Sequence, residues 1–177
     1  MLLPRRQFLL LLVFFAVSLA GCDDDEMRVV SDDNPIGVSP TIIRLEPSQA
    51  VYQVGEPVEI EIVVDRSRDV GSIVFHLSYD PQVLTFVPPA VEGPFMASDG
   101  ADTVFLSGEI QGKGEIVVGA SRIGSPDGVG GTGTLAVFEF NTIASGDCGF
   151  RFTGATVKDP QARSLPAAFT TAAVRVE

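Results

Sequence analysis

The chain has 177 residues, with 23 acidic and 12 basic side chains, a formal net charge of −11, one His and no Trp. Apolar residues make up 45% of the sequence and charged residues 20%, which is typical of a folded globular protein. The negative charge argues against a nucleic-acid partner, because phosphate binding requires a surface rich in Lys and Arg. Two Cys and one His are too few for a Cys₄ or Cys₂His₂ zinc site.

The first 21 residues have the features of an export signal. Arg5 and Arg6 precede an apolar run, Phe8 to Leu19, that is too short to span a bilayer core of about 30 Å. The run closes in Leu19-Ala20-Gly21-Cys22, which resembles the lipobox of bacterial lipoprotein signal peptides. The resemblance implies cleavage before Cys22 and attachment of lipid to its sulfur. We therefore expect a signal peptide over residues 1–21 and a mature chain that is anchored to a membrane through Cys22.

The segment after the lipobox predicts a tether. Residues 22–40 contain four consecutive acids, Asp23 to Glu26, together with two further Asp and two Pro. Such a composition is typical of a solvated linker. Contiguous acids lack the alternating ligand positions of an EF-hand loop, so no Ca²⁺ site is expected here. Cleavage before Cys22 leaves Cys148 as the only Cys that is not lipidated, and we expect a free thiol without a disulfide.

From Thr41 onward the pattern predicts strands and almost no helix. Val58, Ile60, Ile62 and Val64 alternate with positions that include Glu59, Glu61 and Asp65. Comparable apolar alternation recurs at 73–79, 115–121, 133–143, 150–152 and 173–176. Gly- and Pro-containing turns separate these segments, as at Asp80-Pro81 and Ser125-Pro126-Asp127-Gly128. Many short strands without helix–strand alternation predict an all-β sandwich over residues 41–177.

A glycine-rich segment at residues 128–133 formally satisfies the G-x-G-x-x-G pattern of dinucleotide-binding proteins. That site requires a helix directly after the glycines, whose N-terminus faces the pyrophosphate. Here the following residues, 135–140, predict a strand. We therefore expect a flexible loop and no nucleotide.

Four segments, in their order along the chain, resemble a cohesin domain: Gly55–Val58, Val70–Leu84, Gly114–Ala120 and Gly133–Phe140. The most specific of them contains F-x-L-x-Y-D-P-x-x-L, from Phe75 to Leu84. The resemblance covers residues 41–177 and implies a nine-stranded jelly-roll β-sandwich, related to the folds of carbohydrate-binding modules. It also implies a non-catalytic domain that binds dockerins through one flat sheet face. Dockerins carry their own Ca²⁺, so no cofactor or metal is expected in this chain.

The resemblance, combined with the strand alternation, predicts which residues face a partner. These are Ser72, Val74, His76, Glu115, Val117, Gly119, Ser121 and Arg122. Cellulosomal type I cohesins place a polar pair where this chain has Ser72 and Val74, and many carry an acid where it has Arg122. We therefore expect a binding face with altered specificity. His76 is expected to contribute to this face rather than to catalysis, since no nucleophile is indicated beside it.

The sequence thus favours a lipid-anchored, non-catalytic module that binds a protein partner, dockerin-like or other, at the bacterial cell envelope. The alternative is direct polysaccharide binding linked to polysaccharide catabolism. The absence of Trp and the presence of only two Tyr, Tyr52 and Tyr79, argue against an aromatic sugar platform. A glycosidase with paired carboxylates is disfavoured because no acid stands in an apolar setting. The export route, Sec or twin-arginine, and the membrane leaflet are left open.

Overall fold

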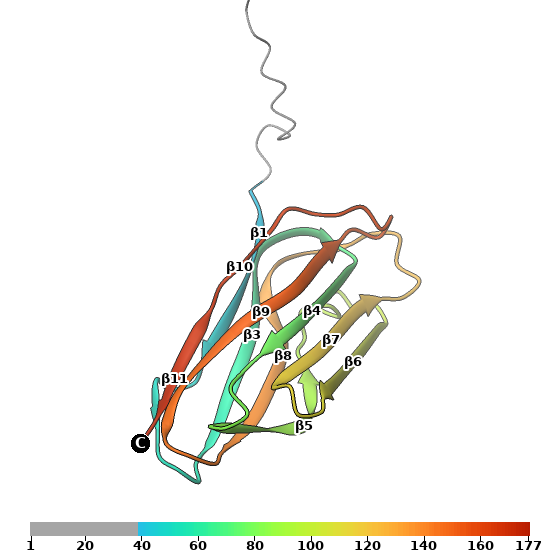
Figure 1. Cartoon of the computed structure of the whole chain (residues 1–177). Helices are drawn as coiled ribbons and strands as arrows, with labels where there is room; N and C mark the ends of the chain where they lie inside the picture. Colours follow the sequence, from blue (N-terminus) through green and yellow to red (C-terminus); the bar gives the residue numbers. More distant parts are fainter. Residues whose placement is uncertain (1–38) are drawn as a thin grey trace, which may run out of the picture. The chain divides into compact units, whose positions relative to one another are not determined.

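The computed structural model describes residues 39–177, which belong to one compact unit, Ile36–Glu177. The predicted signal peptide, Cys22 and most of the predicted tether lie outside the described residues. The described residues form strands and turns (Figure 1). In chain order the strands are β1 (Thr41–Pro47), β2 (Val51–Tyr52), β3 (Pro57–Val70), β4 (Ser72–Ser78), β5 (Leu84–Glu92), β6 (Thr103–Ile110), β7 (Glu115–Arg122), β8 (Val129–Thr142), β9 (Gly146–Lys158), β10 (Ala167–Phe169) and β11 (Ala172–Val176).

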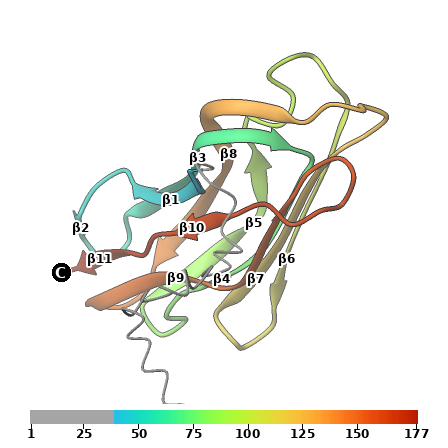
Figure 2. The same ribbon diagram turned by 90° about the horizontal axis from the view of Figure 1, so that it is seen from above.

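The strands make two sheets that lie as separate layers (Figure 2). A five-stranded sheet has the order β10-β1-β3-β8-β5, and a six-stranded sheet has the order β2-β11-β9-β4-β7-β6. The predicted all-β sandwich is therefore confirmed. The expected number of nine strands is approximate, because β2 and β10 add short segments of two and three residues. No helix within residues 39–177 is long and apolar enough to cross a membrane.

The core lies between the inner faces of the two sheets. Period-2 alternation places Ile60 and Ile62 of β3 and Phe75 of β4 inside, each fully buried. Phe75 packs against Phe138 of β8 at a ring-centroid distance of 6.5 Å, which joins the sheets directly. Cys148 of β9 is also buried and unpaired, and burial raises the pKa of its thiol. The free cysteine that the sequence predicted is thus held as the thiol inside the core.

The Asp80-Pro81 turn ends β4 as the sequence predicted. The amide of Gln82 donates to Oδ1 of Asp80 at 2.8 Å, so the carboxylate closes the turn. Leu84 follows as a fully buried core residue. Tyr79, which is 5% exposed, donates its hydroxyl to Glu109 of β6. Burial, together with this hydrogen bond, raises the pKa of Tyr79 well above its ordinary value. The motif thus serves folding by tying the end of β4 to β6.

The glycine-rich segment is not the loop that we expected. Residues 129–133 open β8 and pair with the bulged half of β3. Gly128 lies so close to Asp69 that an added Cβ would be 2.2 Å from the Asp69 carbonyl carbon. Glycine is needed here because the β3 backbone approaches too closely for a side chain. The segment continues directly as a strand, so no helix N-terminus faces it.

Candidate binding face

The structure brings the predicted residues of β4 and β7 together on the outward side of the six-stranded sheet. The two strands are antiparallel neighbours, and their register pairs Ser72 with Ser121 and Val74 with Gly119. His76 pairs with Val117 in the same register. Directly paired residues of an antiparallel ladder point to the same side of the sheet. The predicted positions therefore form one continuous surface, with β7 between β4 and β6 (Figure 1).

The edge strand β6 extends this surface and was missed by the sequence analysis. Val104 pairs with Ser121, and Leu106 pairs with Gly119. Val104 is 41% exposed and Leu106 is 68% exposed, the largest value among the exposed large hydrophobic residues. The sequence does not show this strand by alternation, because Val104-Phe105-Leu106 is apolar at both the inward and the outward positions.

A shallow apolar depression of about 400 Å³ lies between β4, β7 and β6. Its lining includes Val74, Leu106, Gly108, Val117 and Gly119. A Cβ added at Gly108 or Gly119 would meet no atom within 4 Å, so these glycines are not demanded by packing. Without side chains, Gly108 and Gly119 leave the depression open, and Val74 and Leu106 line its sides. We call these five residues the apolar depression.

His76 and Glu115 form a polar pair beside the apolar depression. The Nδ1 atom of His76 lies 2.9 Å from Oε1 of Glu115, and the same oxygen accepts the hydroxyl of Thr153 on β9 at 3.0 Å. The hydrogen bonds from His76 and then Thr153 hold the pKa of Glu115 below its ordinary value. A nucleophilic triad would place the hydroxyl on the second ring nitrogen of the His. Here the Thr153 hydroxyl donates to the carboxylate of Glu115 instead. The three side chains therefore connect β4, β7 and β9 and lack the geometry of a catalytic triad.

Arg122 departs from the expected position on the exposed face. Its side chain is only 2% exposed. The guanidinium donates to both carboxylate oxygens of Asp99, at 2.9 and 2.6 Å, and to the carbonyl of Met96 at 2.6 Å. This arrangement lowers the pKa of Asp99, chiefly through the hydrogen bonds from Arg122. Arg122 therefore ties the loop between β5 and β6 to the end of β7, and it is removed from the partner-facing set.

Other kinds of site have little support in the described part of the chain. Within residues 39–177 no three His, Cys, Asp or Glu side chains are grouped to hold a metal ion. The two Tyr that could stack on a sugar are buried, Tyr52 at 1% and Tyr79 at 5% exposure. The exposed large hydrophobic residues of this region are Val, Leu and Ile. None of these exposed residues in the described region carries an aromatic ring that could stack on a sugar.

Two packed sheets, with an apolar depression on the outward side of one of them, make the domain a β-sandwich module. The sequence model of the cohesin domain family matches residues 44–158, more than half of the chain. The chain belongs to the cohesin domain family, as the sequence motifs predicted. This family comprises non-catalytic protein-binding modules. No curated protein matches the chain by sequence.

Solved structures share the same fold. A non-cellulosomal cohesin from the archaeon Archaeoglobus fulgidus is 21% identical, with a TM-score of 0.64, over 78% of this chain and 92% of that one. A chain from a type II cohesin–X-dockerin complex of Acetivibrio cellulolyticus is 14% identical, with a TM-score of 0.67, over 77% and 99%. A chain from a type I cohesin–dockerin complex of Clostridium thermocellum is 14% identical, with a TM-score of 0.65, over 78% and 94%.

Proposed function

We propose that this chain is a lipid-anchored, non-catalytic binding module that holds a protein partner at the bacterial cell envelope. The partner docks on the outward face of β4, β7 and β6. The observation that carries the proposal is the apolar depression, with Val74 at 46% and Leu106 at 68% exposure beside it. Solvent-exposed aliphatic side chains around a hollow are typical of a protein interface centre.

Family membership supports a protein partner, since two of the similar structures are complexes with dockerins. The lipobox-like Leu19-Ala20-Gly21-Cys22 supports the anchor. The polar pair at His76 and the small residues Ser72 and Ser121 supply the hydrogen-bonding rim of the face. This face suits a dockerin or a dockerin-like helical protein as its partner. Because Ser72 and Val74 replace the polar pair of type I cohesins, the face would prefer a different dockerin from those that type I cohesins bind.

The test uses the chain from Asp23 to Glu177, which keeps the whole compact unit, immobilised and exposed to membrane and envelope proteins of the source organism. Gly119→Arg fills the apolar depression without a backbone clash, because a Cβ at Gly119 meets nothing within 4 Å. We expect this variant to lower the affinity of the retained partner by at least about 100-fold, which corresponds to about 2.7 kcal/mol. Leu106→Gln should lower it by about tenfold. Affinity is measured by surface plasmon resonance with the purified partner.

The matched control is Val91→Gln. The exposed fraction of Val91, 63%, is similar to that of Leu106, but Val91 lies on β5 of the five-stranded sheet. Its replacement should leave binding unchanged. Equal retention of the partner by Gly119→Arg and by the unaltered chain would contradict the proposed face. Recovery of polysaccharide and no protein would contradict the proposed function.

A further inference from the structure

The outward faces of the two sheets carry different charge. Residues 39–177 contain 17 acidic and 9 basic side chains, a formal charge of −8. On the five-stranded sheet, Glu59 of β3 pairs directly with Glu139 of β8. Glu61 pairs with Glu46 of β1, whose charge Arg44 compensates at 3.0 Å. Like charges opposite one another are unfavourable, so this face repels acidic molecules. The six-stranded sheet carries cations without ion pairs in the described region, across β4 from the apolar depression.

Two cations of β9 lie on the same outward face, across β4 from the apolar depression. Lys158 pairs with Ser72, and Arg151 pairs with Ser78, so both point outward with the β4 residues of the face. Neither forms an ion pair with any residue in the described part of the chain. Ser72 and Ser78 are six residues apart on one strand, which separates the two cations by about 20 Å. Val74 and its β9 neighbour Thr156 lie between them.

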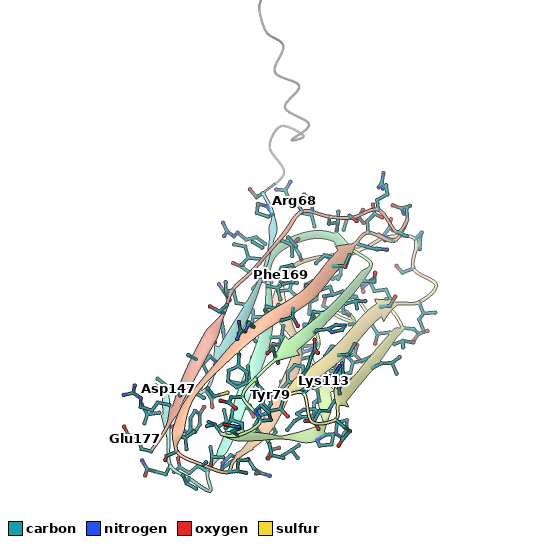
Figure 3. The ribbon with its side chains drawn as sticks, in the orientation of Figure 1. Arg68, Tyr79, Lys113, Asp147, Phe169 and Glu177 are labelled. Carbon is teal, nitrogen blue, oxygen red and sulfur yellow. The ribbon has the colours of Figure 1, made fainter. Side chains whose placement is uncertain are left out.

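Two acids on this side of the sheet, Glu115 and Asp147, have hydrogen-bond or ion-pair partners. Glu115 accepts hydrogen bonds from His76 and Thr153. Asp147 pairs with Arg175 of β11 at 2.8 Å, and in Figure 3 it lies near the C-terminal Glu177, at the opposite end of the domain from Arg68. Lys113, in the turn between β6 and β7, adds another cation without an ion pair in the described region (Figure 3). Glu115 keeps its negative charge, because its pKa is lowered, but the three cations of this side that form no ion pair within residues 39–177 outnumber it: Lys113, Arg151 and Lys158.

We propose that the partner is an acidic protein. It places aliphatic side chains in the apolar depression and carboxylates, about 20 Å apart, on Arg151 and Lys158. This inference rests on the proposed function, because it specifies the chemistry of the partner for the same face. Charge complementarity of this kind selects among partners that share one shape. The acidic five-stranded face would at the same time reject the partner and so direct it to a single side of the domain.

The probe is a display library on a net-neutral three-helix scaffold. Exposed positions along two of its helices vary among Leu, Ala, Gln, Glu and Lys. The library is selected on the chain from Asp23 to Glu177 and counter-selected on Gly119→Arg, so that only binders of the apolar depression are kept. Among the selected scaffolds, we expect Glu to be about ten times as frequent as Lys at the positions that flank the enriched Leu residues. This ratio corresponds to one favourable charge contact.

Charge reversal gives the second measurement. In the double variant Arg151→Glu and Lys158→Glu, the affinity of a selected scaffold should fall by at least about tenfold, and a fresh selection should favour Lys. The matched control is Arg68→Glu, because Arg68 is exposed and forms no ion pair within residues 39–177, but lies on β3 of the other sheet. Thermal unfolding of each variant confirms that these surface changes leave the fold intact.

The outcomes separate the two proposals. If no selected scaffold depends on an open apolar depression, the proposed function fails. If scaffolds bind there without a preference for Glu, or with a preference for Lys, only the acidic partner is refuted. The chain could instead self-associate, and the double variant Arg151→Glu and Lys158→Glu could abolish that association. This result would show that a second copy of the chain occupies the face, and it would refute a separate acidic partner.

Discussion

Arg122 and Arg175 each pair with an Asp, yet their surroundings give the two pairs different roles. The side chain of Arg122 is 2% exposed and bonds Asp99 as well as the carbonyl of Met96. Arg175 is 61% exposed and its partner Asp147 is 68% exposed. Asp99 is itself 53% exposed, so water reaches a carboxylate in both pairs, but only the guanidinium of Arg122 is removed from solvent. The stability of the β5–β6 loop therefore depends on Arg122.

We predict that Arg122→Met lowers the free energy of unfolding by about 2–3 kcal/mol, because methionine keeps the packing but loses the charged hydrogen bonds. Arg175→Met is the matched control and should leave stability nearly unchanged. Urea denaturation of both variants measures the difference. An equal loss of stability in the two variants would show that burial does not set the contribution of Arg122.

Arg122 also marks a limit of prediction from sequence at the residue scale. The alternation of β7 correctly placed Glu115, Val117, Gly119 and Ser121 outward. The same alternation assigned Arg122 to the partner, because nothing near it in sequence shows that Asp99, 23 residues earlier, closes over its guanidinium. An ion pair between a loop and a strand end is a tertiary contact. It has no local signature.

Among the elements, strands with one polar face were predicted well, and those with unusual patterns were not. β3 and β4 alternate clearly, and their core residues Ile60 and Phe75 are buried as expected. β6 was missed because apolar residues occupy both of its sides. The start of β8 was taken for a loop because glycine has low strand propensity. Close approach of the bulged β3 backbone is what requires glycine there, and the sequence does not display that approach.

We predict that Gly128→Ala destabilises the domain by about 1–3 kcal/mol, because its Cβ would clash with the Asp69 backbone and force β3 and β8 apart. Gly149→Ala on β9 is the control, since a Cβ there meets nothing within 4 Å. Thermal unfolding distinguishes the two. A Gly128→Ala variant as stable as Gly149→Ala would show that the strands can separate without cost at this point.

The whole molecule combines a charge-segregated sandwich with a predicted lipid anchor. Six of the 23 acids lie in residues 23–33, ahead of the described region, and the remaining 17 belong to the domain. Glu59 and Glu139 lie on the outward face of the five-stranded sheet, and Arg151 and Lys158 lie on the outward face of the six-stranded sheet. Lipid at Cys22 would confine the module to a membrane surface and raise the local concentration of the partner that it holds.

We predict that Cys22→Ser abolishes lipid attachment and releases the chain from the membrane fraction. Stable anchoring requires more than one acyl chain, all of which depend on processing at this residue. Metabolic labelling with a palmitate analogue, followed by fractionation, measures both effects. Cys148→Ser is the control and should keep label and fractionation unchanged, since this thiol is buried in the core. Labelling of Cys22→Ser at the level of the unaltered chain would contradict the anchor.

The open space above Gly108 and Gly119 has a consequence for how this protein can change over generations. Substitutions at these two positions change the shape of the apolar depression without disturbing the core, because an added Cβ there meets no neighbouring atom within 4 Å. The residues that hold the sandwich together, such as Phe75 and Phe138, lie on the inner faces and are not involved. Selection can therefore adjust recognition and foldability independently, so that duplicated copies of such a domain can acquire new partners while retaining one scaffold.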